Sequence, residues 1–199
     1  AILITVYTVT YGGVQFVSGR LGDRWGKPRM IANATLAAAL ATAACAMAQG
    51  FDSLLGLRAI AGACAGGIIP LAIAYVGDTT AYENRQQAMT RLASIQILGT
   101  IAGQVGAGLI GAALGWRGVL LLLAAMFATG GMTLALALRG SGTAAAATSP
   151  KWAGYGWITS PRARIVLSSV LLEGIFFYAG LAFVASDLQA RHALSLAEA

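Results

Sequence analysis

The stretch Ser18–Met30 reads SGRLGDRWGKPRM and brings four basic residues and one acid together in a short segment. The segments on both sides of it carry almost no charge. Gly22 and Gly26 flank Asp23, and glycine suits a tight turn because it adopts backbone conformations that other residues avoid. Pro28 is well placed to begin a following helix. The stretch is therefore predicted to be a short charged turn between two apolar helices.

The chain as a whole is too apolar for a water-soluble domain. Of its 199 residues, 58% are hydrophobic and 10% are charged, whereas soluble domains carry about 25% charged residues. A bilayer core about 30 Å thick requires about 20 apolar residues per helix. Backbone polar groups in lipid must find their partners within the segment, so long apolar runs form helices there. The sequence therefore predicts an all-α, polytopic membrane helix bundle.

Six apolar runs are long enough to cross the membrane. We expect helices over residues 2–17, 29–48, 53–76, 92–114, 118–138 and 162–186, with a polar loop over 77–90 after the third and a tight turn over 115–117 after the fourth. The low-complexity segment 140–161 is expected to link the fifth helix to the sixth. The chain starts within an apolar run, at Ala1, which indicates the interior of a longer protein.

The basic residues indicate how these helices are oriented. Ten of the 13 lysines and arginines follow the first, third or fifth predicted helix. Cytoplasmic loops are enriched in these residues, so the charged turn is expected on the cytoplasmic side of an inner (plasma) membrane. The net charge of +6 is thereby explained by topology, and no nucleic-acid partner is expected.

Metal, cofactor and enzyme chemistry find little support in the sequence. Cys45 and Cys64 lie in apolar runs, and His192 has no cysteine near it, so neither a metal site nor a cofactor is expected. Membrane-embedded enzymes that use metals need clustered ligands. The chain has one histidine and no D-x-x-x-D pattern, which argues against an enzyme.

The charged turn resembles the G-x-L-x-D-R-x-G-R/K motif of the major facilitator superfamily, which joins the second and third of about twelve helices. Three further patterns agree with the family in order. RAIAG, with Arg58 and Gly62, resembles a motif of the fourth helix, and residues 81–89 resemble the loop before the fifth. GTIAGQVGAG resembles the helix-bending motif of proton-coupled antiporters, with Gln104 where the family has proline. The matching positions are Gly19, Leu21, Asp23, Arg24, Gly26 and Lys27 in the turn, and Gly99, Gly103 and Gly108 in the antiporter motif.

The resemblance implies a fragment that covers the family's second to seventh helices, or six of about twelve. Residues 1–139 would belong to the N-terminal bundle, 140–161 to the cytoplasmic linker and 162–199 to the start of the C-terminal bundle. The implied activity is secondary active transport by alternating access, with small-molecule substrates, protons and lipid as partners. Proton-coupled efflux of a small organic molecule or drug is favoured, by a protein that is monomeric at full length. Uptake or facilitated diffusion of a sugar or metabolite, or a non-transporting receptor of the same fold, remain alternatives.

The resemblance also implies roles for particular residues. Asp23 and Lys27, with Asp78 or Glu83, would form a cluster that holds one conformation, although a solvated pair is worth only about 0–1 kcal/mol. Arg58 and Gly62, with the acid Glu173, would take part in proton coupling. The alternatives are that Arg58 extends to the outer headgroups and that Glu173 is a protonated acid that hydrogen-bonds a neighbouring helix. The polar candidates for a substrate cavity, which would otherwise bridge helices, are Gln15, Asn33, Tyr75, Gln96, Gln104 and Tyr178.

Overall fold

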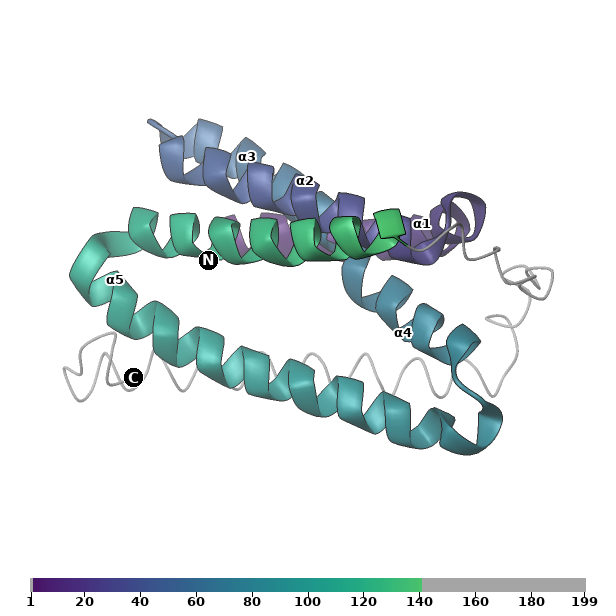
Figure 1. Ribbon diagram of the computed structural model, residues 1–199. Coiled ribbons are helices and arrows are strands. Elements are labelled where there is room, and N and C mark those ends of the chain that lie inside the picture. The colour runs from purple at the N-terminus through teal and green to yellow at the C-terminus, as the bar shows by residue number, and fades with distance from the viewer. Residues whose placement is uncertain (1, 141–199) are drawn as a thin grey trace, which may run out of the picture. The chain divides into compact units, whose positions relative to one another are not determined.

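The computed structural model describes residues 2–140, and every regular element within them is an α-helix. The described residues belong to the first of two units of the chain, Ala1–Ala147 and Thr148–Ala199. Four helical stretches in this part are long and apolar enough to cross a membrane, if α3 and α4 are taken as one. This confirms the predicted membrane helix bundle. The helices are α1 (Ile2–Trp25), α2 (Lys27–Met47), α3 (Phe51–Ala65), α4 (Ile68–Thr79) and α5 (Tyr82–Gly140) (Figure 1).

The charged turn is much shorter than the sequence predicts. Helix α1 continues to Trp25 and α2 begins at Lys27, so Gly26 alone separates them. Gly26 has a φ of 86°, which glycine adopts without strain. The 24 residues of α1 extend about 36 Å at 1.5 Å per residue, which exceeds the bilayer core of about 30 Å. The expected loop is therefore helical, because packing of its buried positions, such as Gly22, continues beyond the apolar run.

The third predicted helix is interrupted in the structure. Residues 53–76 were expected to form one helix, but α3 ends at Ala65 and α4 begins at Ile68. The cause is Pro70, which has no N–H to donate to the carbonyl of Gly66 four residues earlier and whose ring crowds that carbonyl. Figure 1 shows α4 leaving the direction of α3 at this point.

Helix α5 consists of two arms. Gly115, with φ 67° and ψ 178°, is the non-helical position within it and separates residues 82–114 from 116–140. This agrees with the expected tight turn between the fourth and fifth helices. The prediction of a loop over 77–90 is wrong, because α4 reaches Thr79 and α5 starts at Tyr82. Glutamate, glutamine and arginine in that segment favour a helix, so its polar composition was not evidence for a loop.

Gly115→Ala is expected to lower the free energy of unfolding by about 1–3 kcal/mol. Its φ and ψ lie in a region essentially restricted to glycine, and strain there costs about that much. The thermal unfolding midpoint of the purified protein in detergent measures the loss. Gly106→Ala is the matched control, because Gly106 lies in the helical first arm and no atom lies within 4 Å of a Cβ built there. Equal midpoints for the two variants would contradict the proposed strain.

Small residues form the core where α2 meets α3 and the second arm of α5. Its members are Ala41, Cys45, Ala46, Ala61 and Leu120. Such residues let helix backbones approach closely in a membrane, where packing drives association. The backbones of α1 and α3 also approach closely, since a Cβ at Gly62, or at Gly66 just after α3, would meet the backbone carbonyl of Tyr7 or Tyr11.

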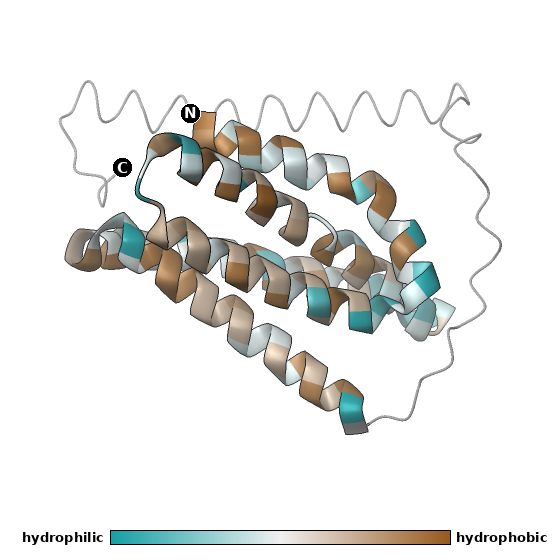
Figure 2. Ribbon diagram, turned by 90° about the horizontal axis from the view of Figure 1, so that it is seen from above, coloured by the Kyte–Doolittle hydropathy of each residue, from teal (hydrophilic) through white to brown (hydrophobic). Residues whose placement is uncertain are grey.

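Large apolar side chains point outward along most of the described helices. Figure 2 shows hydrophobic residues over most of their length. The first arm of α5 is the most exposed part, with Ile95 68% and Leu109 66% exposed. Threonine hydroxyls in the helices donate to carbonyls of their own helix, as Thr35 does to Ile31 at 2.7 Å. A lipid environment explains both the exposed apolar side chains and the hydroxyl groups bonded within their own helix, because lipid accepts apolar surface and offers no hydrogen bonds.

Candidate functional site

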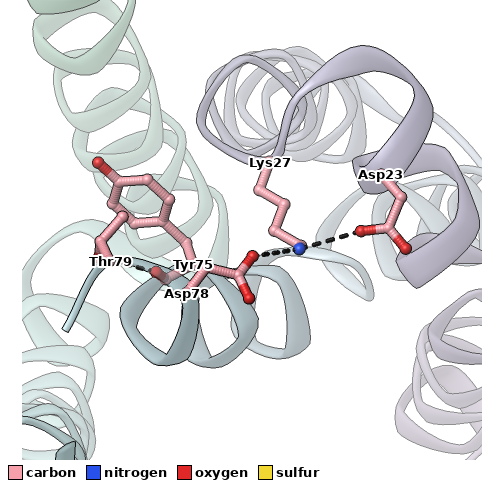
Figure 3. Close-up of polar contacts among 5 residues, drawn as sticks. All are labelled: Asp23, Lys27, Tyr75, Asp78 and Thr79. Atoms are coloured by element: carbon pink, nitrogen blue, oxygen red, sulfur yellow. Dashed lines mark hydrogen bonds and ion pairs between the residues drawn. The ribbon is translucent and has the colours of Figure 1, made fainter. Parts of the chain in front are cut away.

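A cluster of three charged residues forms where α4 meets the charged turn: Asp23, Lys27 and Asp78, called the charge cluster below. The Lys27 Nζ lies 3.0 Å from Asp23 Oδ1 and also contacts Asp78 Oδ2. Figure 3 shows the lysine reaching between the two carboxylates. The acids come from the ends of α1 and α4, so the cluster joins three helices. The structure thus places Asp78, rather than Glu83, against Lys27.

The surroundings make the charge cluster stronger than an ordinary surface pair. The Lys27 side chain is only 12% exposed, whereas those of the two acids are 33% and 32% exposed. Lys27 is the first residue of α2, where the helix dipole disfavours a positive charge and favours negative ones. The two carboxylates therefore offset both the lysine charge and the positive end of α2.

Gly22 and Leu71 hold the helices of the charge cluster together. Leu71 in α4 is 1% exposed, and its side chain occupies the position where a Cβ at Gly22 would lie. Gly19 is the first glycine of the motif in the charged turn, but no atom lies within 4 Å of a Cβ built there. Gly22 is three residues further on and faces α4, so it is the residue that permits this contact.

A cavity of about 290 Å³ lies beside the charge cluster. Its lining comes from α1, α2, α3 and α4 and is largely apolar. On α1 the lining residues are Val14, Ser18, Leu21 and Trp25, which share one helix face. This cavity was not predicted from the sequence, although the spacing of the four lining residues on α1 can be seen in the sequence. Among the substrate-cavity candidates that the structure describes, Asn33 is the one that lines it.

Arg58 occupies the interface of α1, α2 and α3. Its charge acts on Tyr7 of α1 and Cys45 of α2. Its Nε atom is buried and lacks a hydrogen-bond partner among the described residues. Gly62, one turn later, lies against Tyr7 and Thr10. An unsatisfied buried donor is costly, so Arg58 is a candidate to bind an acceptor that the described residues do not supply.

The antiporter-like stretch of α5 is a continuous helix. The helical backbone runs past Gly99 and Gly103, with its break at Gly115 instead. A Cβ at either of these glycines would meet nothing within 4 Å, and Gln104 is exposed. With glutamine in place of proline, the backbone N–H at position 104 is retained, and the helix has no cause to kink there.

The remaining sequence candidates do not meet in the described part of the chain. Gln15 and Gln96 are exposed, and Tyr75 is 41% exposed. Glu173 and Tyr178 lie outside the described residues. No group of three or more potential metal ligands occurs within residues 2–140.

The opposite end of the bundle has a contact that the sequence did not predict. Arg117 Nη2 donates to the carbonyl oxygen of Ala48 at 3.0 Å, just after α2 ends. The guanidinium also lies 4.9 Å from the centre of the Trp116 ring. A basic group at a helix C-terminus is favourable. Residue 117 therefore meets residue 48 at one end of the bundle and Lys27 meets Asp78 at the other, as helices of alternating direction require.

Comparisons with known proteins agree with this arrangement. A family model described as Major Facilitator Superfamily matches residues 1–196. The MFS-type transporter clz4 of Cochliobolus lunatus is 33% identical over 61% of this chain and 21% of its own length. The niacin transporter NiaP of Acinetobacter baylyi is 33% identical over 50% of this chain and 23% of its own. The puromycin resistance protein pur8 of Streptomyces alboniger is 29% identical over 58% of this chain and 23% of its own. The chain thus spans less than a third of the length of these relatives.

Proposed function

Because the chain belongs to the major facilitator superfamily, we propose that it forms part of a secondary active transporter that works by alternating access. In this mechanism two helical bundles rock about a site near the middle of the membrane. The charge cluster is the observation that carries the proposal. Its residues come from three helices and include a lysine with 12% exposure, so the cluster fixes how α1, α2 and α4 are arranged at one end of their bundle, and one of the two conformations is proposed to depend on that arrangement.

The charge cluster acts as a reversible latch for one of the two conformations. A transporter needs states that differ by only a few kcal/mol, so that substrate can shift the balance between them. Two contacts on one largely buried lysine are proposed to supply a stabilisation of that order, because a pair that is screened from water is worth more than the roughly 0–1 kcal/mol of a solvated pair. Because Asp78 belongs to α4, the latch is sensitive to the position of α4. Pro70 interrupts the helix between α3 and α4, so α4 is a separate helix from α3.

The transport is proposed to be proton-coupled efflux of a small organic molecule or drug from the cytoplasm across the inner (plasma) membrane, by a protein that is monomeric at full length. The antibiotic resistance in the name of pur8 supports this direction.

Arg58 and Glu173 are the proposed coupling residues, because a positive charge near a carboxyl group stabilises its ionised form and promotes proton release. The buried Arg58 Nε, which lacks a described partner, supports a role in binding such a carboxylate. The name of NiaP favours a second candidate, uptake of a small metabolite.

Inside-out membrane vesicles distinguish these functions. The chain is expressed at its full natural length, and accumulation of the cationic dye ethidium and of nicotinate is followed with a proton gradient imposed. Efflux coupling predicts that ethidium enters these vesicles, that protons leave, and that a protonophore stops both movements. Glu173→Gln is expected to abolish gradient-driven accumulation while passive exchange of substrate continues. Nicotinate movement that is independent of the gradient, with no ethidium movement, would instead favour facilitated diffusion.

A further inference from the structure

The cavity beside the charge cluster has the form of a binding site for one lipid chain. It lies between α1 and α2, with α3 and α4 behind it. Trp25 is 58% exposed and Asn33 is exposed, so part of the wall opens to the surroundings. Its volume of about 290 Å³ is at the lower end of the range for small-molecule pockets, which is about 300–1,000 Å³. The cavity thus suits a slender apolar group better than a bulky one.

The length of the cavity matches one leaflet of the bilayer. Its lining on α1 runs from Val14 to Trp25, a distance of about 16 Å at 1.5 Å per residue. One leaflet supplies about half of the hydrocarbon core, or about 15 Å. Trp25 lies at the end of α1, and tryptophan prefers the headgroup region, so we infer that this end of the cavity lies at headgroup level. The cavity therefore runs from headgroup level toward the middle of the membrane.

Two arginines mark the headgroup end of the cavity. Arg24 is three residues from Leu21 on α1, and Arg29 is four residues from Asn33 on α2. Residues three or four apart are neighbours on a helix surface, so each arginine borders the lining face of its helix, near the end where α1 and α2 meet. Both arginines are exposed. The acid nearest to them in sequence, Asp23, is paired with Lys27.

We propose that this cavity binds an anionic phospholipid, with its phosphate at Arg24 and Arg29 and one acyl chain along the apolar wall. Asn33, one turn deeper than Arg29, is placed to donate to the ester groups. Basic pockets between membrane helices on the cytoplasmic side bind anionic headgroups in this way. Leu71 belongs both to the cavity wall and to the contact with Gly22, so the bound lipid also supports the packing beneath the charge cluster.

Native mass spectrometry of the protein at its full natural length tests the headgroup. Phosphatidylglycerol and phosphatidylcholine with identical acyl chains are titrated against the protein in detergent. Each arginine contributes about fivefold to binding of an anionic lipid, so a preference of about 30-fold for phosphatidylglycerol is expected. The double variant R24Q/R29Q should lose this preference. R85Q/R91Q, which removes the same charge from exposed positions at the start of α5, should retain it.

The acyl chain is tested through Cys64, which lines the cavity. Bound phosphatidylglycerol is expected to slow labelling of Cys64 by N-ethylmaleimide at least fivefold, while glycerol 3-phosphate, which has no acyl chain, leaves it unchanged. A37L, which fills the cavity, should weaken binding of both lipids, whereas A102L on the exposed first arm of α5 should not.

Three results would overturn the proposal. They are an equal loss of preference in R85Q/R91Q, an unchanged labelling rate of Cys64, and protection of Cys64 by glycerol 3-phosphate alone. The first would indicate diffuse surface charge, the second would place the lipid elsewhere, and the third would indicate a site for a free phosphate. The transport activity does not enter any of these measurements, so they stand apart from the proposed function.

Discussion

Asp23→Asn is expected to lower the transport rate about tenfold or more while membrane insertion remains normal. The substitution removes the carboxylate that lies 3.0 Å from Lys27 Nζ and leaves the lysine with Asp78 alone. The conformation held by the charge cluster then loses population relative to the other. A change of about 1.4 kcal/mol in that balance alters the populations tenfold. The position lies at the end of α1 and is partly exposed, so folding should tolerate the neutral side chain.

Initial rates of substrate movement in vesicles measure this effect, normalised to the amount of inserted protein. Glu83→Gln is the matched control, because Glu83 is an exposed acid at the start of α5 that the structure does not place against Lys27. This control should transport at nearly the original rate. An unchanged rate in Asp23→Asn would rule out a latch at the charge cluster, and an equal fall in both variants would point to a general loss of surface charge.

Gly62→Leu is expected to prevent α1 and α3 from packing. A Cβ at Gly62 would collide with the backbone carbonyl oxygen of Tyr7 and with Thr10 Oγ1. Backbone cannot move aside as a flexible side chain can, so the cost should reach or exceed the upper end of the range for overpacking, about 3 kcal/mol. The whole of α1 would have to shift, which also moves Gly22 away from Leu71.

The yield of monodisperse protein in size-exclusion chromatography is the measurement, and a loss of most of the folded material is expected. Gly56→Leu provides the matched control on the same helix, because no atom lies within 4 Å of a Cβ at that position. Leucine at Gly56 should leave the yield unchanged or raise it, since leucine favours helix over glycine. If the two variants behave alike, close backbone contact at Gly62 does not hold these helices together.

Several features of the fold could be predicted from local sequence. Apolar runs predicted the helices of residues 2–140, and Gly115 was correctly expected to lie in a turn. The ends of the helices were less accurate, because polar helix formers at 82–91 resemble a loop in composition. The break between α3 and α4 had a visible signal in Pro70, but proline is tolerated in many membrane helices, so its effect depends on the neighbouring packing.

The candidate site was only partly predictable. Asp23 and Lys27 are four residues apart, so their pairing follows from helix geometry. Which glycine faces α4 depends on the rotation of α1, and that rotation is set by its neighbours; the sequence therefore did not indicate that Gly22, rather than Gly19, makes this contact. The roles of Arg58 and Glu173 remain proposals.

What the sequence determined by itself is the class of the protein, the order of its apolar helices and the clustering of charge at their ends. These follow from chain length, lipid thickness and the need of each backbone group for a partner within its own segment. Only the tertiary structure decided that Asp78, rather than Glu83, meets Lys27 from 51 positions away, and that a cavity opens near them. Such contacts depend on how helix faces interlock in three dimensions, and no local pattern carries that information.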